Sequence, residues 1–222
     1  MDSKYRNRSE AGRFLSQKLS DYAHRPDVVV LALPRGGVPV AYEVAKALGA
    51  TLDIFLVRKL GLPGHEELAM GAIASGGVRV LNDSVVRAFN IGPATMERVT
   101  ADEQRRLEHR ERLYRGKWPF PELSGKIVIL VDDGLATGSS MRAAVTALRQ
   151  KHPARIVIAV PTAAPETCEA FRHEVDEVVC GRTPDPFLAV GLWYKDFSQT
   201  SDDEVRDLLE KAHREQLATA AH

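Results

Sequence analysis

Short runs of consecutive apolar residues, separated by segments of helical character, constrain the fold of this chain more than any other feature. Val28 to Leu33 and Ile127 to Val131 are uninterrupted apolar runs rich in β-branched residues, and Arg155 to Val160 is similar. Runs of this length and composition are typical of strands that are buried on both faces of a sheet. They are far shorter than the ~20 residues that a membrane-spanning helix needs, so no membrane segment is predicted.

Segments with apolar residues at helical spacing lie between these runs. We expect an amphipathic helix within 7–22, a helix from about Val38 to Leu48 that ends at Gly49, a helix after the 127–131 run that continues to about Gln150, and a helix that starts near Pro165. Leu52 to Val57 and the pair Val178 and Val179 are read as two further strands.

This alternation of strands and helices predicts an α/β fold. The expected architecture is a doubly wound, mostly parallel five-stranded sheet with helices on both faces. In such sheets ligands bind beyond the carboxyl ends of the strands. The turns that follow Leu33, Val57 and Val131 are therefore the places where binding residues are expected.

Two segments do not follow the alternation. Residues 94–117 are highly charged, and acidic residues precede basic ones by four positions, as in Asp102 and Arg106. This spacing favours a solvated helix with ion pairs on its surface, within an insertion at 83–122. The alternative is a basic arm that binds a polyanion, which the interspersed acidic residues disfavour. The second segment is the aromatic-rich C-terminal lobe at 183–222, which ends in a helix from about Asp202 to Leu217.

The overall charge argues against a protein whose whole surface binds nucleic acid or anionic lipid. The chain has 222 residues, of which 30 are basic and 30 acidic, so its formal net charge is zero. No nucleic-acid partner is therefore predicted. Any site for an anion must be a local one.

The two cysteines and the N-terminus bear on the expected compartment. Cys168 and Cys180 form no spacing typical of a disulfide framework or a metal site, and we interpret both as small buried thiols. The first residues carry basic side chains without the apolar stretch of a signal peptide. A reducing cytoplasm is the expected location.

The stretch that follows Ile127 to Val131 carries the most chemical information. An apolar strand there delivers two adjacent carboxylates, Asp132 and Asp133, to its carboxyl end, and small residues from Gly134 to Ser140 then open a helix. Backbone N–H groups and hydroxyls at a helix N-terminus can bind a phosphate without any lysine. Carboxylates beside a phosphate suit sugar hydroxyls or a divalent cation. A simple helix cap with incidental acids would not explain two acids at the end of a buried strand.

This stretch resembles the signature of the type I phosphoribosyltransferases, enzymes that use phosphoribosyl pyrophosphate (PRPP). In that family the acidic pair holds the ribose 2′- and 3′-hydroxyls and the following loop binds the 5′-phosphate. The resemblance implies that Asp132 and Asp133 hold the ribose and act in catalysis. It assigns the 5′-phosphate to Ala136, Thr137, Gly138, Ser139 and Ser140.

Two further loops resemble the pyrophosphate-binding parts of the family. The first is Arg35-Gly36-Gly37 after the first strand, where the small residues would let the backbone approach pyrophosphate and Arg35 would supply charge. The peptide bond before the basic residue is often cis in these loops, and here this would be the Pro34–Arg35 bond. The second is the pair Arg58 and Lys59, which resembles a basic pair that often reaches across a dimer interface. An ordinary glycine turn and a surface charge pair are the alternatives.

The resemblance implies that residues 60–69 correspond to the mobile catalytic loop of the family. Closure of such a loop excludes water from a reactive ribosyl cation. Glu66 is our candidate for proton transfer within it, and His65 and Glu67 are further candidates. Acidic residues on a loop are otherwise usually solvated.

The C-terminal lobe at 183–222 resembles the hood of the 6-oxopurine enzymes. Phe187 and Trp193 are the candidates for stacking on a base, with core packing as the alternative. Asp196 matches an acid that meets magnesium in that group, so Asp132, Asp133 and Asp196 are the implied metal ligands.

The acceptor of the phosphoribosyl group is not determined by these motifs. The 6-oxopurine enzymes have an aspartate at the position of Ala136, so transfer to hypoxanthine or guanine in their usual manner is in doubt. The motif is closer to that of the adenine and orotate enzymes. The further loop lysine of the orotate enzymes is missing from Leu60 to Glu67.

The resemblance implies a Mg²⁺-dependent phosphoribosyltransferase, a glycosyltransferase of nucleotide and nucleoside metabolism. It implies one domain over 1–222, with a core at about 28–182, and small-molecule partners only, PRPP and a base or amine. It also implies a homodimer, because Arg58 and Lys59 would act across an interface. The alternative function is a regulatory protein that binds PRPP without catalysis.

Overall fold

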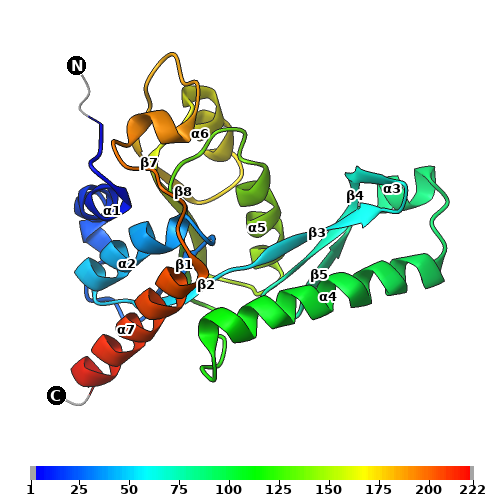
Figure 1. The fold of residues 1–222 in the computed structure, drawn as a ribbon, viewed down its shortest axis with the longest axis horizontal. Helices are drawn as coiled ribbons and strands as arrows, with labels where there is room; N and C mark the ends of the chain where they lie inside the picture. The colour runs from blue at the N-terminus through cyan, green and yellow to red at the C-terminus, as the bar shows by residue number, and fades with distance from the viewer. Residues whose placement is uncertain (1–3, 221–222) are drawn as a thin grey trace.

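A central sheet of five parallel strands forms the middle of the molecule (Figure 1). The computed structural model describes residues 4–220, except for the side chains of residues 66, 67, 219 and 220. The strand order is β2-β1-β6-β7-β8, and each neighbouring pair is parallel. The strands are β1 (Val28–Ala32), β2 (Thr51–Ile54), β6 (Ile127–Val131), β7 (Arg155–Thr162) and β8 (Glu177–Arg182). The predicted five-stranded parallel sheet is confirmed.

Helices cover both faces of this sheet, as predicted. They are α1 (Arg8–Gln17), α2 (Gly37–Leu48), α5 (Ser139–Arg149), α6 (Pro165–Phe171) and α7 (Asp202–Ala220). Residues of α1, α2 and α7 share one hydrophobic core, and residues of α5 and α6 share a second core. Within the described part of the chain, no helix has the length and apolar character to cross a membrane.

Each central strand feeds both cores because successive side chains point to opposite faces. Val30 of β1 lies in the core beside α1 and α2, and its neighbour Leu31 lies in the core beside α5. Ile129 and Leu130 of β6 divide in the same way. The uninterrupted apolar runs of the sequence follow from this two-sided burial.

The ends of the first two helices follow local sequence signals. Asn7 caps α1, where its side-chain oxygen accepts a hydrogen bond from the Glu10 N–H at 3.0 Å. Gly49 ends α2 in the left-handed conformation, with φ of 64°. The predicted opening helix is shorter than 7–22, because α1 stops at Gln17 and a 3₁₀ turn at Ser20–Tyr22 follows.

A second, antiparallel sheet corrects the predicted strand at 52–57. It contains β3 (Val57–Leu62), β4 (His65–Ala74) and β5 (Val78–Leu81). The apolar run 52–57 therefore divides between β2 in the first sheet and β3 in the second. Phe55 and Leu56 connect the two strands and are buried. Because they are as apolar as the strands, the sequence gives no sign that the chain passes from one sheet to the other here.

The hairpin of β3 and β4 also corrects the loop expected at 60–69. Only Pro63 and Gly64 separate the two strands, and the rest of the expected loop lies within them. The pairing is irregular on both sides of Gly61, where the register shifts. The segment that corresponds to the catalytic loop is therefore a β-hairpin.

The second sheet and a long helix project together from the central sheet (Figure 1). Helix α3 (Asp83–Ala88) lies at the far end of this arm, and α4 (Pro93–Arg115) runs back along the strands to the core. The predicted charged helix at 94–117 is confirmed by α4. Proline at its first turn and Gly116 after its end are typical helix boundaries.

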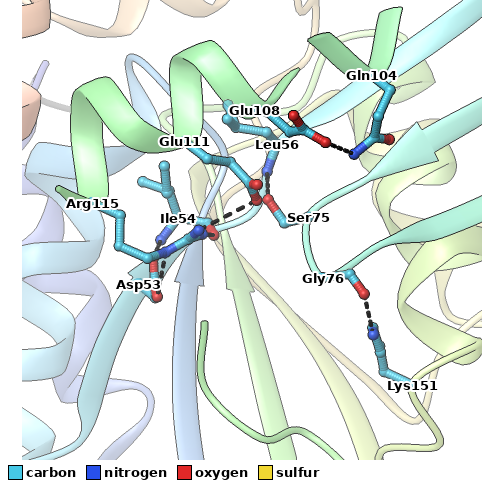
Figure 2. A network of polar contacts seen from close by, with 10 residues as sticks. All are labelled: Asp53, Ile54, Leu56, Ser75, Gly76, Gln104, Glu108, Glu111, Arg115 and Lys151. Carbon is cyan, nitrogen blue, oxygen red and sulfur yellow. Dashed lines mark hydrogen bonds and ion pairs between the residues drawn. The ribbon is translucent and has the colours of Figure 1, made fainter. Parts of the chain in front are cut away.

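A buried ion pair attaches the end of α4 to the central sheet (Figure 2). Arg115 Nε lies 3.0 Å from both carboxylate oxygens of Asp53, and Arg115 Nη1 lies 3.3 Å from Glu111 Oε1. Arg115 is 6% exposed and Asp53 is 1% exposed. Burial raises the pKa of Asp53, and the charge of Arg115 opposes that rise. The pair therefore joins β2 to the end of α4 through side chains that are almost completely buried.

The two cysteines form a disulfide, so the prediction of two separate thiols is wrong. Cys168 lies in α6 and Cys180 lies in β8, with a Cα–Cα distance of 6.6 Å. The parallel fold brings these residues together although 12 positions separate them in the sequence. Disulfides are more typical of oxidising compartments, so the cysteine argument for a reducing cytoplasm no longer holds.

Candidate active site

The two acids after β6 lie side by side at the carboxyl end of the central strand. The Asp133 N–H donates a hydrogen bond to Asp132 Oδ1 at 2.8 Å. Burial and the neighbouring charge of Asp133 raise the pKa of Asp132 well above its usual range. Burial also raises the pKa of Asp133. Two desolvated carboxylates on adjacent residues need a compensating charge or a polar ligand.

The loop at 134–140 leads from the acids into α5. Gly138 has a positive φ of 74°, and a Cβ atom there would lie 2.6 Å from the Phe171 ring. Thr167 of α6 donates a hydrogen bond to the Ala136 carbonyl at 2.6 Å. Ala136, Thr137, Ser139 and Ser140 are exposed. The loop thus rests on α6 and presents backbone and hydroxyl groups to solvent at a helix N-terminus, an arrangement that suits a phosphate.

The loop after β1 lies directly against the acids. A Cβ atom on Gly36 would lie 2.0 Å from Asp133 Oδ2, and one on Gly37 would lie 2.7 Å from the Val131 carbonyl oxygen. Only residues without a side chain allow this approach. The Pro34–Arg35 peptide bond is cis. Because β1 and β6 are neighbours in the sheet, the two loops meet at the same edge.

Arg35 pairs with an acid at the start of α7, and a tyrosine of α4 contacts the same acid. Its Nη1 atom lies 3.4 Å from Asp202 Oδ1, at the start of α7. The Tyr114 hydroxyl of α4 donates to the same oxygen at 2.5 Å. These hydrogen bonds lower the pKa of Asp202, and burial together with Asp202 raises the pKa of Tyr114 to about 12. Arg35 thus belongs to the loop that lies beside the acid pair, and its guanidinium has Asp202 as a counter-ion.

The basic pair Arg58 and Lys59 lies within β3 rather than after β2. Since neighbouring residues of a strand point to opposite faces, the two side chains separate. Arg58 pairs with Glu103 of α4, and Lys59 is exposed. Both border a cleft of about 680 Å³ that Ser139 and Ser140 of the phosphate loop also border. The cleft connects the basic residues with the N-terminus of α5.

The candidates for proton transfer lie in the hairpin. His65 begins β4 and is exposed, and its ring lies 6.1 Å from the Phe89 ring. The side chains of Glu66 and Glu67 lie outside the described part of the structure. The role of Glu66 therefore stays a prediction.

Three residues that the sequence analysis missed cover the acid pair. The Tyr194 hydroxyl donates a hydrogen bond to the Asp133 carbonyl at 2.5 Å, and burial raises the pKa of Tyr194. Val190 packs so closely on Gly134 that a Cβ atom there would lie 2.3 Å from it. Arg8 of α1 forms an ion pair with Asp133. No local sequence signal links these residues, which are remote from 132–134 in the chain.

The predicted base-stacking residues of the C-terminal lobe differ in their environments. Trp193, in a 3₁₀ turn at Val190–Trp193, packs against the cluster of Tyr5, Ala11 and Tyr194. Its indole nitrogen is buried without a hydrogen-bond partner in the described part of the chain. This environment favours the packing alternative for Trp193. Phe187 is half-buried.

The acid pair fits a magnesium ion better than the predicted three-acid set does. No group of three or more His, Cys, Asp or Glu side chains that could hold a metal occurs among the described residues. Asp196 is exposed, and it accepts a hydrogen bond from the Ser198 N–H at 3.0 Å. Mg²⁺ commonly uses one or two carboxylates together with substrate phosphates. Asp132 and Asp133 fit that pattern, and Asp196 does not join them.

The parallel sheet, the acid pair and the two loops at one edge define a protein of the type I phosphoribosyltransferase fold. The chain belongs to the phosphoribosyl transferase domain family, whose model matches residues 4–187. The architecture thus shows the fold, and the sequence over most of its length shows the family.

The chain is similar to curated proteins and to a protein of known structure. Two curated relatives, from Mycobacterium tuberculosis strains CDC 1551 / Oshkosh and H37Rv, are provisionally named phosphoribosyl transferases. Each is 49% identical over 210 residues, which is 94% of this chain and 47% of the relative. The chain thus spans about half the length of these relatives. The crystal structure of TT1426 from Thermus thermophilus is 42% identical, with a TM-score of 0.82 over 94% of this chain and 98% of that one.

Proposed function

We propose that this chain is a PRPP-dependent phosphoribosyltransferase that transfers the 5-phosphoribosyl group to a nucleobase-like nitrogen acceptor. The acceptor nitrogen forms a bond to C1 of the ribose with its lone pair. The C1–O bond breaks, and its electron pair leaves with pyrophosphate. The proton of the nitrogen passes to a carboxylate of the hairpin, for which Glu66 is the candidate, or to solvent.

The observation that carries this proposal is the contact between the acid pair and the loop after β1. Gly36 and Gly37 approach Asp132 and Asp133 without room for a side chain, and the phosphate loop follows directly. A sugar, a 5′-phosphate and a diphosphate therefore have adjacent binding groups at one edge of the sheet. PRPP is a molecule that carries all three.

Each part of the site has a distinct task in this proposal. Asp132 and Asp133 accept hydrogen bonds from the ribose hydroxyls and stabilise the positive charge that develops at C1. Ala136, Thr137, Gly138, Ser139 and Ser140 bind the 5′-phosphate.

The basic residues would hold the leaving group. Arg35, Gly36 and Gly37 bind pyrophosphate, and Lys59 with Arg58 adds charge from the cleft. Magnesium, held with the diphosphate by Asp132 and Asp133, would neutralise the charge of the leaving group. Phe187 stays a candidate for contact with the acceptor.

Several further features belong to the proposal. We treat residues 1–222 as one functional domain that forms a homodimer, with a role in nucleotide and nucleoside metabolism. A cytoplasmic location is kept because PRPP carries several charges and would not cross a bilayer.

The test is an assay of pyrophosphate release with PRPP, Mg²⁺ and a panel of purines, pyrimidines and small amines. We expect release with at least one acceptor, and its loss in the double variant Asp132→Asn/Asp133→Asn. Asp21→Asn, at an exposed position away from the site, is the matched control. Full activity of the double variant would refute the assignment of the acids.

A regulatory protein that binds PRPP without catalysis is the second candidate function. It would use the same acid pair and the same two loops, so the geometry of the PRPP site is common to both functions. PRPP binding without pyrophosphate release for any acceptor would support this second function. Calorimetry with PRPP beside the release assay separates the two functions.

A further inference from the structure

We infer that Arg8, at the start of α1, is a positioning residue that holds Asp133 in place for the ribose of PRPP. This inference rests on the proposed function and extends the site to a segment before the parallel core. Arg8 acts through Asp133, so it is not itself expected to contact the reacting atoms.

The contact between Arg8 and Asp133 engages only one carboxylate oxygen. Arg8 Nε and Arg8 Nη2 both lie 2.9 Å from Asp133 Oδ2. The other oxygen, Oδ1, stays outside this ion pair. In Asp132 the oxygen Oδ1 accepts the Asp133 N–H, so Oδ2 lies outside that hydrogen bond. Each acid is therefore oriented through one oxygen and keeps a second one for the two ribose hydroxyls.

The guanidinium of Arg8 is itself held in place by the C-terminal lobe. Its Nη1 atom donates a hydrogen bond to the Ser198 carbonyl at 2.7 Å. Its Cζ atom lies 4.0 Å from the centre of the Phe197 ring, a distance typical of a cation–π contact. The Arg8 side chain is 11% exposed. These partners fix the orientation of the guanidinium. Its contacts with Asp133 Oδ2 then fix the orientation of that carboxylate.

The chain before α1 is fixed to the same lobe. The Tyr5 N–H donates to the Trp193 carbonyl at 2.9 Å, and the Lys195 N–H donates to the Tyr5 carbonyl at 2.8 Å. The Asp196 N–H donates to the Arg6 carbonyl at 3.0 Å. These hydrogen bonds fix the residues that immediately precede Arg8 in the chain. The N-terminal segment and the C-terminal lobe thus form one support for the acid pair.

The experiment compares PRPP with pyrophosphate, because Arg8 acts on the ribose acid only. Binding of each to the full chain is measured by calorimetry for the wild type, Arg8→Met and Arg8→Lys without Mg²⁺, which Asp133 would otherwise help to hold beside pyrophosphate. The wild type is also measured with Mg²⁺. Arg8→Met removes a charge-assisted contact, so we expect PRPP to bind about tenfold or more weakly. Pyrophosphate should bind as it does to the wild type. Arg8→Lys restores the charge without the two-donor fork and should recover part of the affinity.

The matched control is Arg13→Met on the same helix, which removes an exposed ion pair with Glu43. It should change neither affinity. Thermal unfolding is recorded for each variant, and if Arg8→Met does not fold, the comparison of the two ligands is made on Arg8→Lys. Equal PRPP affinity of the folded Arg8 variants and the wild type would overturn the inference, and so would tighter binding. An equal loss for both ligands would show a merely structural role. A wild type that binds no PRPP would instead refute the proposed function.

Discussion

Gly36 and Asp133 are in such close contact that a methyl group on Gly36 would lie 2.0 Å from Asp133 Oδ2. The backbone of Gly36 does not require glycine, because its φ of −60° and ψ of −32° are ordinary helical values. The requirement for glycine at this position is therefore one of space. It comes from a carboxylate that the chain reaches almost a hundred residues later.

We predict that Gly36→Ala damages the site more than the fold. The added methyl must displace the Asp133 side chain, at a typical overpacking cost of about 1–3 kcal/mol. PRPP binding by calorimetry should weaken about tenfold or more. Gly92→Ala is the control, since a Cβ atom there meets nothing within 4 Å and φ is −70°. Wild-type affinity in Gly36→Ala would show that the loop can move away from the acid.

The ion pair between Asp53 and Arg115 should be critical for attachment of the arm. Arg115→Met leaves the buried Asp53 carboxylate without its ion-pair partner, which typically destabilises a protein by about 3–5 kcal/mol. The free energy of unfolding in urea measures the loss. The double variant Asp53→Leu/Arg115→Met should recover much of it, because the buried charge of Asp53 is removed too and only the less buried Glu111 still loses its partner. Arg112→Met, which removes an exposed pair with Glu108, should change stability by less than about 0.5 kcal/mol.

The disulfide between Cys168 and Cys180 should stabilise helix α6, on which the loop at 134–140 rests. Cys168 is next to Thr167, whose hydroxyl holds the Ala136 carbonyl. Closing a loop of this length contributes about 2–4 kcal/mol. We expect Cys168→Ala/Cys180→Ala to lower the urea midpoint accordingly and to weaken PRPP binding. Dithiothreitol should lower the midpoint of the wild type and leave that of the variant unchanged. Identical midpoints for the oxidised wild type and the variant would contradict this prediction.

Two buried tyrosines predict a loss of stability at alkaline pH. Burial, with a hydrogen bond to Glu177, raises the pKa of Tyr22 to about 12, and burial with Asp202 does the same for Tyr114. The folded state then keeps protons that the unfolded state releases above pH 10.0. The stabilisation is complete below that pH and is lost as the pH rises through about 12.

The alkaline prediction is tested with Tyr22→Phe/Tyr114→Phe. Urea unfolding measured in steps from neutral pH upward should give a flatter alkaline decline for this variant than for the wild type. The neutral region should differ only by the lost hydrogen bonds. Parallel curves for the two proteins would show that these hydroxyls titrate normally.

The elements of the central sheet could be predicted because their signals are local. Uninterrupted apolar runs marked β1, β6 and β7, and helical spacing marked the helices between them. Gly49 marked the end of a helix through its own backbone preference. The change of sheet within 52–57 had no local signal, because Phe55 and Leu56 are as buried as the strands on either side.

The candidate site was predictable only where one segment contains the whole feature. The acid pair and the small-residue loop follow one strand, so a single stretch of sequence carries them. The direction of Arg58 and Lys59 depended on the second sheet, which separates their side chains. The partners of Asp133 come from both ends of the chain, and neither Arg8 nor Tyr194 stands in a recognisable motif.

The sequence by itself determined the α/β alternation, the parallel sheet and the strand that carries Asp132 and Asp133, because strand and helix periodicity arise from neighbouring residues. The tertiary structure decided the pairing of Arg8 with Asp133, of Arg115 with Asp53 and of Cys168 with Cys180. These contacts join residues up to 125 positions apart. Their formation depends on which strands become neighbours and which helices cover them, and that choice is a property of the packed chain.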